Sequence, residues 1–222
     1  MNKRQAKILI VDDHPLVRAG FHQLIADEPD LSVCGEASNQ REALQIVKKT
    51  TPDVTIIDIS LRSGSGLDLI KRLHAKDPGI RILVASMYED SIFAERALKA
   101  GATGYINKRE APSNILSAVR QVLKGEIYLS PKMAEHMQVR SDNNTETPPQ
   151  PAEYSVVNKL TDREVEVFDL IGRGLSTNQI ADKLHLSVKT IETHRAHIKE
   201  KLNIHSNNLL VLRAMQWTLG RQ

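Results

Sequence analysis

The stretch Ile8-Leu9-Ile10-Val11-Asp12-Asp13 decides the fold expected for the first half of this chain. Four consecutive apolar residues end abruptly at two aspartates. A continuous apolar run of this kind is typical of a parallel strand that is buried on both faces of a sheet. Open sheets of this type place their functional sites at the carboxyl ends of the strands. The stretch therefore predicts a buried strand with an acidic pair at its functional end.

Four more apolar runs follow this one, and amphipathic segments separate them. The predicted strands span residues 8–12, 31–37, 54–58, 80–86 and 104–107. Helical patterns lie near residues 15–26, 39–50, 66–76, 90–100 and 113–124. Five β-α units of this size predict an α/β domain, a (βα)5 doubly wound parallel sheet, over residues 1–127.

A connection and a second, all-α domain follow. Residues 128–157 are expected to form a short helix near 130–139 and then a flexible linker, because residues 141–151 include no apolar side chain that could bury surface. Thr161 and Ser176 each begin a capping-box sequence, and Ser187 and Ser206 can cap two further helices. Residues 158–222 therefore predict a four-helix helix-turn-helix domain.

Composition limits the possible locations and partners. The chain of 222 residues is 41% hydrophobic and 26% charged, with a net charge of +3. No apolar run approaches the roughly 20 residues of a membrane span. The single cysteine, Cys34, cannot form an internal disulfide and is expected to be a small buried side chain, so a cytoplasmic location is expected. Residues 155–222 hold ten Lys and Arg against seven Asp and Glu, a mildly basic balance that permits DNA binding.

Polar side chains stand at the ends of four predicted strands. Asp12 and Asp13 end the first strand, Asp58 ends the third, Ser86 ends the fourth, and Lys108 follows the fifth. The first and third strands are commonly neighbours in such sheets, so the three carboxylates should converge. Packed carboxylates repel, and Mg²⁺ is the hard cation that such oxygen donors favour. Asp58 is the nucleophile candidate for attack on phosphorus, while Lys108 and Ser86 would bind phosphoryl oxygens.

Each residue also has a purely structural interpretation. Asp12 and Asp13 could cap the next helix, a strand-end aspartate is usually a turn residue, and a lone lysine is usually solvated. The joint arrangement at several strand ends favours a phosphoryl-acceptor site.

Residues 5–127 resemble the receiver domains of two-component response regulators. The resemblance is carried by four stretches: Ile10-Val11-Asp12-Asp13-His14, Ile56-Ile57-Asp58, Leu83-Val84-Ala85-Ser86 and Gly101-Ala102-Thr103-Gly104-Tyr105-Ile106-Asn107-Lys108. It implies that Asp58 accepts a phosphoryl group from the phosphohistidine of a partner kinase. It also implies one Mg²⁺ held directly by Asp13 and Asp58, through water by Asp12, and by the backbone carbonyl of Ser60.

The same resemblance implies a conformational switch. Ser86 would move to the phosphate, and the ring of Tyr105 would turn inward. Two positions depart from the family pattern, because Arg62 and Arg109 stand where prolines are common. Both lie in loops beside the pocket, so they bear on loop conformation and phosphate lifetime more than on the reaction.

The segment from Ser187 to Leu202 is the predicted recognition helix. Val188, Ile191, Ile198 and Leu202 can share a buried face, which leaves a polar and basic face outward, as a helix in the DNA major groove requires. A small bundle with a solvated charged face is the alternative. His194 and His197 are three residues apart, but no third metal ligand lies near them in the sequence.

Residues 158–218 resemble the DNA-binding domain of the LuxR/NarL (GerE-like) regulators. The resemblance is carried by three stretches: Leu160-Thr161-Asp162-Arg163-Glu164, Gly174-Leu175-Ser176-Thr177-Asn178-Gln179-Ile180-Ala181 and Ser187-Val188-Lys189-Thr190-Ile191-Glu192-Thr193-His194. It implies base-edge contacts by Glu192, Thr193 and Ala196. It also implies DNA backbone contacts by a second set: Lys189, Thr190, His194, Arg195 and Lys199. The last helix resembles the family's dimer surface, although Trp217 in it could equally be core.

These observations predict a homodimeric response regulator of the NarL/FixJ type that takes phosphoryl from a histidine kinase and binds promoter DNA. A regulator that binds DNA without phosphorylation is the first alternative. A Mg²⁺-dependent aspartyl phosphohydrolase is the second, but many such enzymes need an aspartate where Ser60 stands. The chain is therefore not expected to be an enzyme, beyond slow loss of its own phosphate.

Overall fold

A computed structural model describes residues 4–61, 64–87, 91–110, 112–130, 133–134, 157 and 159–219. The chain divides into two compact units, Met1–Arg140 and Ser141–Gln222, and each is described by itself. The expected helix at 130–139 and linker at 141–151 lie almost wholly outside the described residues. Residues 130, 133 and 134 are the exceptions, and of these residues 133 and 134 are helical. Among the described residues, no helix is long and apolar enough to cross a membrane.

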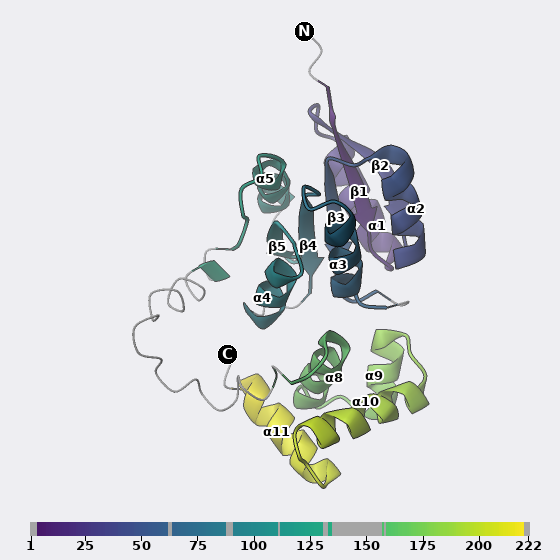
Figure 1. The fold of residues 1–222 in the computed structure, drawn as a ribbon, viewed down its shortest axis with the longest axis vertical. Helices are drawn as coiled ribbons and strands as arrows, with labels where there is room; N and C mark the ends of the chain where they lie inside the picture. Colours follow the sequence, from purple (N-terminus) through teal and green to yellow (C-terminus); the bar gives the residue numbers. More distant parts are fainter. Residues whose placement is uncertain are drawn as a thin grey trace. The chain divides into compact units, whose positions relative to one another are not determined.

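The first unit contains a parallel sheet of five strands (Figure 1). The strands are β1 (Ala6–Val11), β2 (Leu31–Ala37), β3 (Val54–Asp58), β4 (Ile82–Ser86) and β5 (Gly104–Asn107). Their order is β2-β1-β3-β4-β5, so β1 and β3 are neighbours and the chain order reverses at β1. This arrangement confirms the predicted doubly wound α/β fold and brings the ends of β1, β3, β4 and β5 to one edge.

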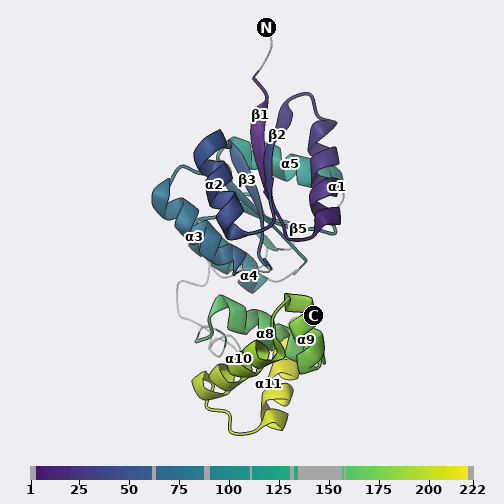
Figure 2. The ribbon, with the colours of Figure 1, turned by 90° about the vertical axis from the view of Figure 1, so that its right-hand side faces the viewer.

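Helices cover both faces of this sheet (Figure 2). Helices α1 (Pro15–Ala26) and α5 (Pro112–Leu123) pack together on one face. Helices α2 (Gln40–Thr50), α3 (Gly66–Lys76) and α4 (Ser91–Lys99) follow one another across the other face. The apolar run Ile8–Val11 of β1 is fully buried between these layers, as a continuous apolar run predicts.

Strand β2 behaves differently because it lies at the edge of the sheet. Its middle residues are only half-buried, and the expected burial of Cys34 is therefore wrong. The Cys34 thiol lies 3.6 Å from the Thr50 hydroxyl, a long contact for a weak donor. The local apolar run could not show that this strand has a neighbour on one side only.

The second unit is a cluster of four helices: α8 (Asp162–Gly172), α9 (Thr177–Leu184), α10 (Val188–Lys201) and α11 (Asn207–Leu219). Reciprocal capping boxes begin α8 at Thr161 and α9 at Ser176, and the Ser187 hydroxyl caps α10. These caps confirm the helix starts predicted from the sequence.

Apolar side chains from all four helices form the core of this unit. Trp217 is buried and its ring lies 5.4 Å from that of Phe168, so the core interpretation of Trp217 is the correct one. Ile191 and Ile198 are buried as expected. Val188 is 40% exposed, so its place in the expected buried face is wrong. It is the first residue of α10 and lies at the end of the apolar face rather than within it.

Candidate functional site

An acidic pocket lies at the carboxyl ends of β1 and β3. The side chains of Asp12, Asp13 and Asp58 are almost completely buried. Each offers an oxygen, and His14 a ring nitrogen, such that these four atoms all lie within 4.8 Å of one another. The pairing of Val11 with Ile57 brings the strand ends together. The structure therefore gathers the three carboxylates that the sequence placed on two separate strands.

Lys108 supplies positive charge to this pocket. Its Nζ lies 2.5 Å from Asp12 Oδ2 and 2.8 Å from Asp58 Oδ2, and its side chain is only 5% exposed. The Lys108 backbone N–H donates to the carbonyl oxygen of Ser86, which links the loop after β5 to the end of β4. A single lysine thus bridges two of three buried carboxylates, and negative charge remains in excess.

The electrostatics of Asp58 follow from this burial. Burial raises the pKa of the Asp58 carboxyl, the Lys108 ammonium opposes the rise, and the neighbouring Asp12 carboxylate adds to it. The net pKa lies above its ordinary value. A divalent cation would offset the same repulsion, and its presence would favour the ionised form.

The donor set fits a hard cation. Three carboxylates with buried oxygens are typical of a Mg²⁺ site, since Mg²⁺ prefers oxygen ligands and binds through few protein carboxylates. The Ser60 N–H donates to Asp58 Oδ1 over 3.2 Å, so the backbone of Ser60 turns beside the nucleophile candidate. Ser60 therefore lies next to Asp58, one of the carboxylates with which its carbonyl was expected to hold the Mg²⁺.

Ser86 and Tyr105, the expected switch pair, are both fully buried. Ser86 ends β4 and pairs in register with Asn107 of β5. The Tyr105 N–H donates to the Tyr128 carbonyl over 2.9 Å, and the Tyr128 N–H donates to Thr103 over 3.1 Å. The chain that leaves α5 is therefore hydrogen-bonded along the outer edge of β5.

Sequence reasoning missed His14. It is the N-cap residue of α1, with an extended backbone and no side-chain cap bond, so the acidic pair does not cap α1 in the usual way. Its Nδ1 lies 2.7 Å from Asp13 Oδ1 and 3.3 Å from Asp12 Oδ1. The signal that could have found it is its position directly after the acidic pair, where the chain must turn back over the pocket.

Gly66, the first residue of α3, packs closely against the backbone of Asp58, the nucleophile candidate. A Cβ atom on Gly66 would lie 2.0 Å from the Asp58 carbonyl oxygen and 2.8 Å from the Ile59 Cα. The Gly66 N–H donates to the Ile59 carbonyl over 2.7 Å. Glycine is therefore required here for close approach, a role that the sequence pattern did not reveal.

Arg62 and Arg109 are the two positions that depart from the receiver-family pattern, and the structure describes only the second of them. Arg62 lies outside the described residues. Arg109 is exposed, and its N–H donates to Asn107 Oδ1 over 2.8 Å, so the loop after Lys108 is held by a side chain in place of proline.

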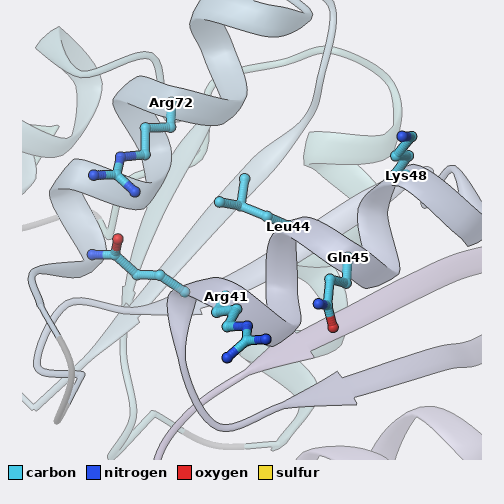
Figure 3. A pocket seen from close by; sticks show the side chains of 6 residues that line it. Arg41, Leu44, Gln45, Lys48 and Arg72 are labelled. Atoms are coloured by element: carbon cyan, nitrogen blue, oxygen red, sulfur yellow. The ribbon is translucent and has the colours of Figure 1, made fainter.

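A hollow of about 520 Å³ lies away from these residues, between α2 and α3 (Figure 3). Its lining residues are Gln40, Arg41, Leu44, Gln45, Lys48 and Arg72. None of them belongs to the acidic pocket or to the predicted DNA contacts.

The predicted DNA contacts all lie on α10, and none of them is buried. Lys189, Glu192, Thr193 and Ala196 are exposed. Thr190, His194, Arg195 and Lys199 are half-buried. The buried residues Ile191 and Ile198 hold the opposite face of α10 against the core. The helix therefore presents its polar face outward, as a helix that enters a groove must.

Two of these residues have shifted pKa values. Burial lowers the pKa of His194, and the nearby Arg163 acts in the same direction. Burial also lowers the pKa of Arg195, while the Glu192 carboxylate opposes this shift. Glu192 and Arg195 are three residues apart on α10, so they lie on neighbouring turns of the same helix.

Two family patterns match the chain. Residues 8–120 match the family described as "Response regulator receiver domain". Residues 158–214 match the family described as "Bacterial regulatory proteins, luxR family".

Curated relatives are similar over nearly their whole length. The "Oxygen regulatory protein NreC" of Staphylococcus carnosus is 37% identical over 211 residues, which are 95% of this chain and 97% of that protein. The "Response regulator GacA" of Pseudomonas aeruginosa is 34% identical over 211 residues, 95% of each chain.

Solved structures share the fold. A LuxR-family two-component response regulator from Aurantimonas has a TM-score of 0.59 at 34% identity, covering 62% of this chain and 99% of that one. RcsB from Salmonella enterica, solved bound to a promoter with a phosphomimetic, has a TM-score of 0.61 at 23% identity, covering 96% and 99%.

Proposed function

Because the chain belongs to the LuxR/NarL family of two-component response regulators, we propose that phosphorylation of Asp58 controls its binding to promoter DNA. Its receiver domain implies a histidine kinase as partner, and its helix-turn-helix domain binds DNA and controls transcription. It is a regulator and not an enzyme. We assign residues 1–127 to the receiver, 128–157 to the connection and 158–222 to the DNA-binding domain, and place the protein in the cytoplasm.

The observation that carries the proposal is the buried pair of Asp58 and Lys108. A carboxylate oxygen of Asp58 attacks the phosphorus of a phosphohistidine, a P–O bond forms, the P–N bond breaks, and the imidazole leaves. The Lys108 Nζ already lies 2.8 Å from Asp58 Oδ2, so the ammonium can contact an oxygen of the phosphoryl group on Asp58 with little movement. The Ser86 hydroxyl, at the end of the next strand, would donate to another.

Asp12, Asp13, Asp58 and the Ser60 carbonyl would hold one Mg²⁺, which when bound neutralises the carboxylates and the incoming phosphoryl group. Lys108 alone leaves these three buried carboxylates with excess negative charge, and this imbalance supports the assignment.

The state of the receiver would reach the rest of the chain through β5. We assign the switch to Ser86 and Tyr105. The backbone of Tyr105 is hydrogen-bonded to Tyr128, which lies at the start of the connection. Displacement of β5 would therefore act directly on the segment that leads to the second domain.

An exposed apolar stripe on α11 supports a homodimer on DNA. Four side chains at helical spacing are exposed: Leu209, Leu212, Met215 and Leu219. Such a stripe suits a self-complementary contact between two copies. Two α10 helices would then read half-sites about one DNA turn apart, roughly 34 Å. Lys189, Thr190, His194, Arg195 and Lys199 would contact the DNA backbone, and Glu192, Thr193 and Ala196 the base edges.

Footprinting tests the proposal. The full chain is applied to genomic promoter DNA with and without acetyl phosphate and Mg²⁺, as wild type, Asp58→Ala and the control Asp68→Ala, an exposed aspartate on α3. Acetyl phosphate should strengthen the footprints of wild type and control but not that of Asp58→Ala. A wild-type footprint that does not respond would support the phosphorylation-independent alternative.

Salt dependence tests the DNA face. Replacing Lys189 and Lys199 with alanine should flatten the dependence of log affinity on log salt by about 0.9 for each DNA phosphate that the variant no longer neutralises. The control replaces two exposed lysines of the receiver, Lys48 and Lys76, with the same change in net charge. An unchanged slope in the first variant would remove those residues from the interface.

A further inference from the structure

We propose that His14 is an additional donor in the receiver's metal site and shifts its preference from Mg²⁺ toward cations that bind imidazole, such as Co²⁺. The inference rests on the proposed metal site at Asp12, Asp13 and Asp58. It concerns which divalent cation the site accepts and how tightly.

The geometry places the imidazole against the carboxylates. Nδ1 of His14 lies 2.7 Å from Asp13 Oδ1 and 3.3 Å from Asp12 Oδ1. The ligand atoms of these residues and Asp58 all lie within 4.8 Å of one another. One cation could therefore contact oxygen and nitrogen donors together after only small side-chain adjustments.

The backbone holds His14 in this position. Its N–H donates to Asp12 Oδ1 over 2.8 Å, and its carbonyl accepts from the Arg18 N–H over 3.1 Å in the first turn of α1. Pro15 follows directly and restricts the backbone conformation of His14. The side chain is 49% exposed, whereas the carboxylates are buried. His14 therefore lies at the mouth of the pocket, where a cation enters from solvent.

The chemistry of the donor set predicts the selectivity. Carboxylate and carbonyl oxygens suit Mg²⁺, which gains little from a nitrogen ligand. Imidazole suits later transition metals, and affinity for such mixed sites rises from Mn²⁺ through Co²⁺ to Ni²⁺. A site with one imidazole beside three carboxylates should discriminate between Mg²⁺ and Co²⁺ more strongly than carboxylates alone.

Calorimetric titration of the untagged full chain at fixed pH tests this. Mg²⁺ and Co²⁺ are titrated separately into wild type, His14→Asn and His22→Asn. His22 is a matched control because it lies in the same domain, is also 49% exposed, and has its Nδ1 2.7 Å from a carboxylate oxygen of Glu36. The visible absorption of bound Co²⁺ reports independently whether nitrogen is a ligand.

His14→Asn should weaken Co²⁺ binding about tenfold or more and change Mg²⁺ binding less than about threefold. Its Co²⁺ absorption should shift toward that of an all-oxygen site, while His22→Asn behaves as wild type. Equal losses for both cations would show that His14 only orients Asp13, and this would overturn the inference. An equal effect of His22→Asn would also overturn it. Failure of wild type to bind either cation would instead reject the underlying metal site.

Discussion

Replacing Gly66 with alanine should damage the phosphoryl-acceptor site without touching any side chain of it. The added Cβ would lie 2.0 Å from the Asp58 carbonyl oxygen, where ordinary contact begins at 3.4 Å. It would also lie 2.9 Å from the Asp58 carbonyl carbon and 2.8 Å from the Ile59 Cα. All three atoms belong to the backbone, so no side-chain rotation can relieve the overlap.

The expected losses of stability and of phosphorylation rate follow from this overlap. Either α3 or the end of β3 must move by more than about 1 Å, because repulsion rises steeply inside van der Waals contact. Overpacking of this kind costs about 2–3 kcal/mol, or roughly 10 °C in the melting temperature of a domain of this size. A displacement of about 1 Å at a reacting group can reduce its rate about 100-fold. Phosphorylation of Asp58 by acetyl phosphate should fall by a comparable factor.

Two measurements check this prediction. Intact-mass spectrometry follows phosphoryl incorporation, and scanning calorimetry follows the receiver transition. Gly20→Ala in α1 is the matched control, because nothing lies within 4 Å of its added Cβ, and it should stabilise the helix by about 0.5–1 kcal/mol. Fluorescence of Trp217, the single tryptophan, reports the second domain and should be unchanged. A Gly66→Ala protein with wild-type rate and melting temperature would refute the reasoning.

Two further predictions concern the second domain. Burial raises the pKa of Glu164, but hydrogen bonds from Lys201 and from the Thr161 cap outweigh it and leave the pKa lowered. This ionic stabilisation is therefore present above the unfolded pKa of about 4.3 and is lost as pH falls through the lower folded value. Glu164→Gln should cost about 1–2 kcal/mol at pH 7 in urea unfolding, and a difference that persists undiminished near pH 3 would contradict this. Gly172→Ala would place a Cβ 2.3 Å from the Ala214 carbonyl oxygen, forcing α8 from α11 and lowering the urea midpoint followed by tryptophan fluorescence. An unchanged midpoint would contradict this second prediction.

Local sequence patterns were sufficient for the elements and for most of the candidate site. Apolar runs located the strands because buried parallel strands need apolar side chains on both faces, and the first polar residue marks the strand end. The same runs were enough to place Asp58 and Lys108 at strand ends. Capping at Thr161 and Ser176 located two helix starts for a similar reason, since a cap is a hydrogen bond within four residues.

Contacts between segments that are distant in the sequence decided which of these residues are buried and where glycine is required. Cys34 is half-buried because β2 has a neighbour on one side only, and strand order depends on all five strands together. Trp217 proved to be core because α11 packs against α8. Glycine is required at position 66 because the backbone of Asp58, at the end of β3, lies too close for a Cβ atom. A loop separates these two residues in the sequence.

The acidic pocket shows most clearly which features the local sequence determines and which depend on the tertiary structure. The sequence by itself determined that carboxylates, a hydroxyl and a lysine stand at strand ends, because strand termini are encoded locally. Only the tertiary structure decided that Lys108 bridges Asp12 and Asp58 and that His14 turns back onto Asp13. Side-chain direction at a strand end depends on where the neighbouring strands and the following helix lie, and no local pattern encodes that placement.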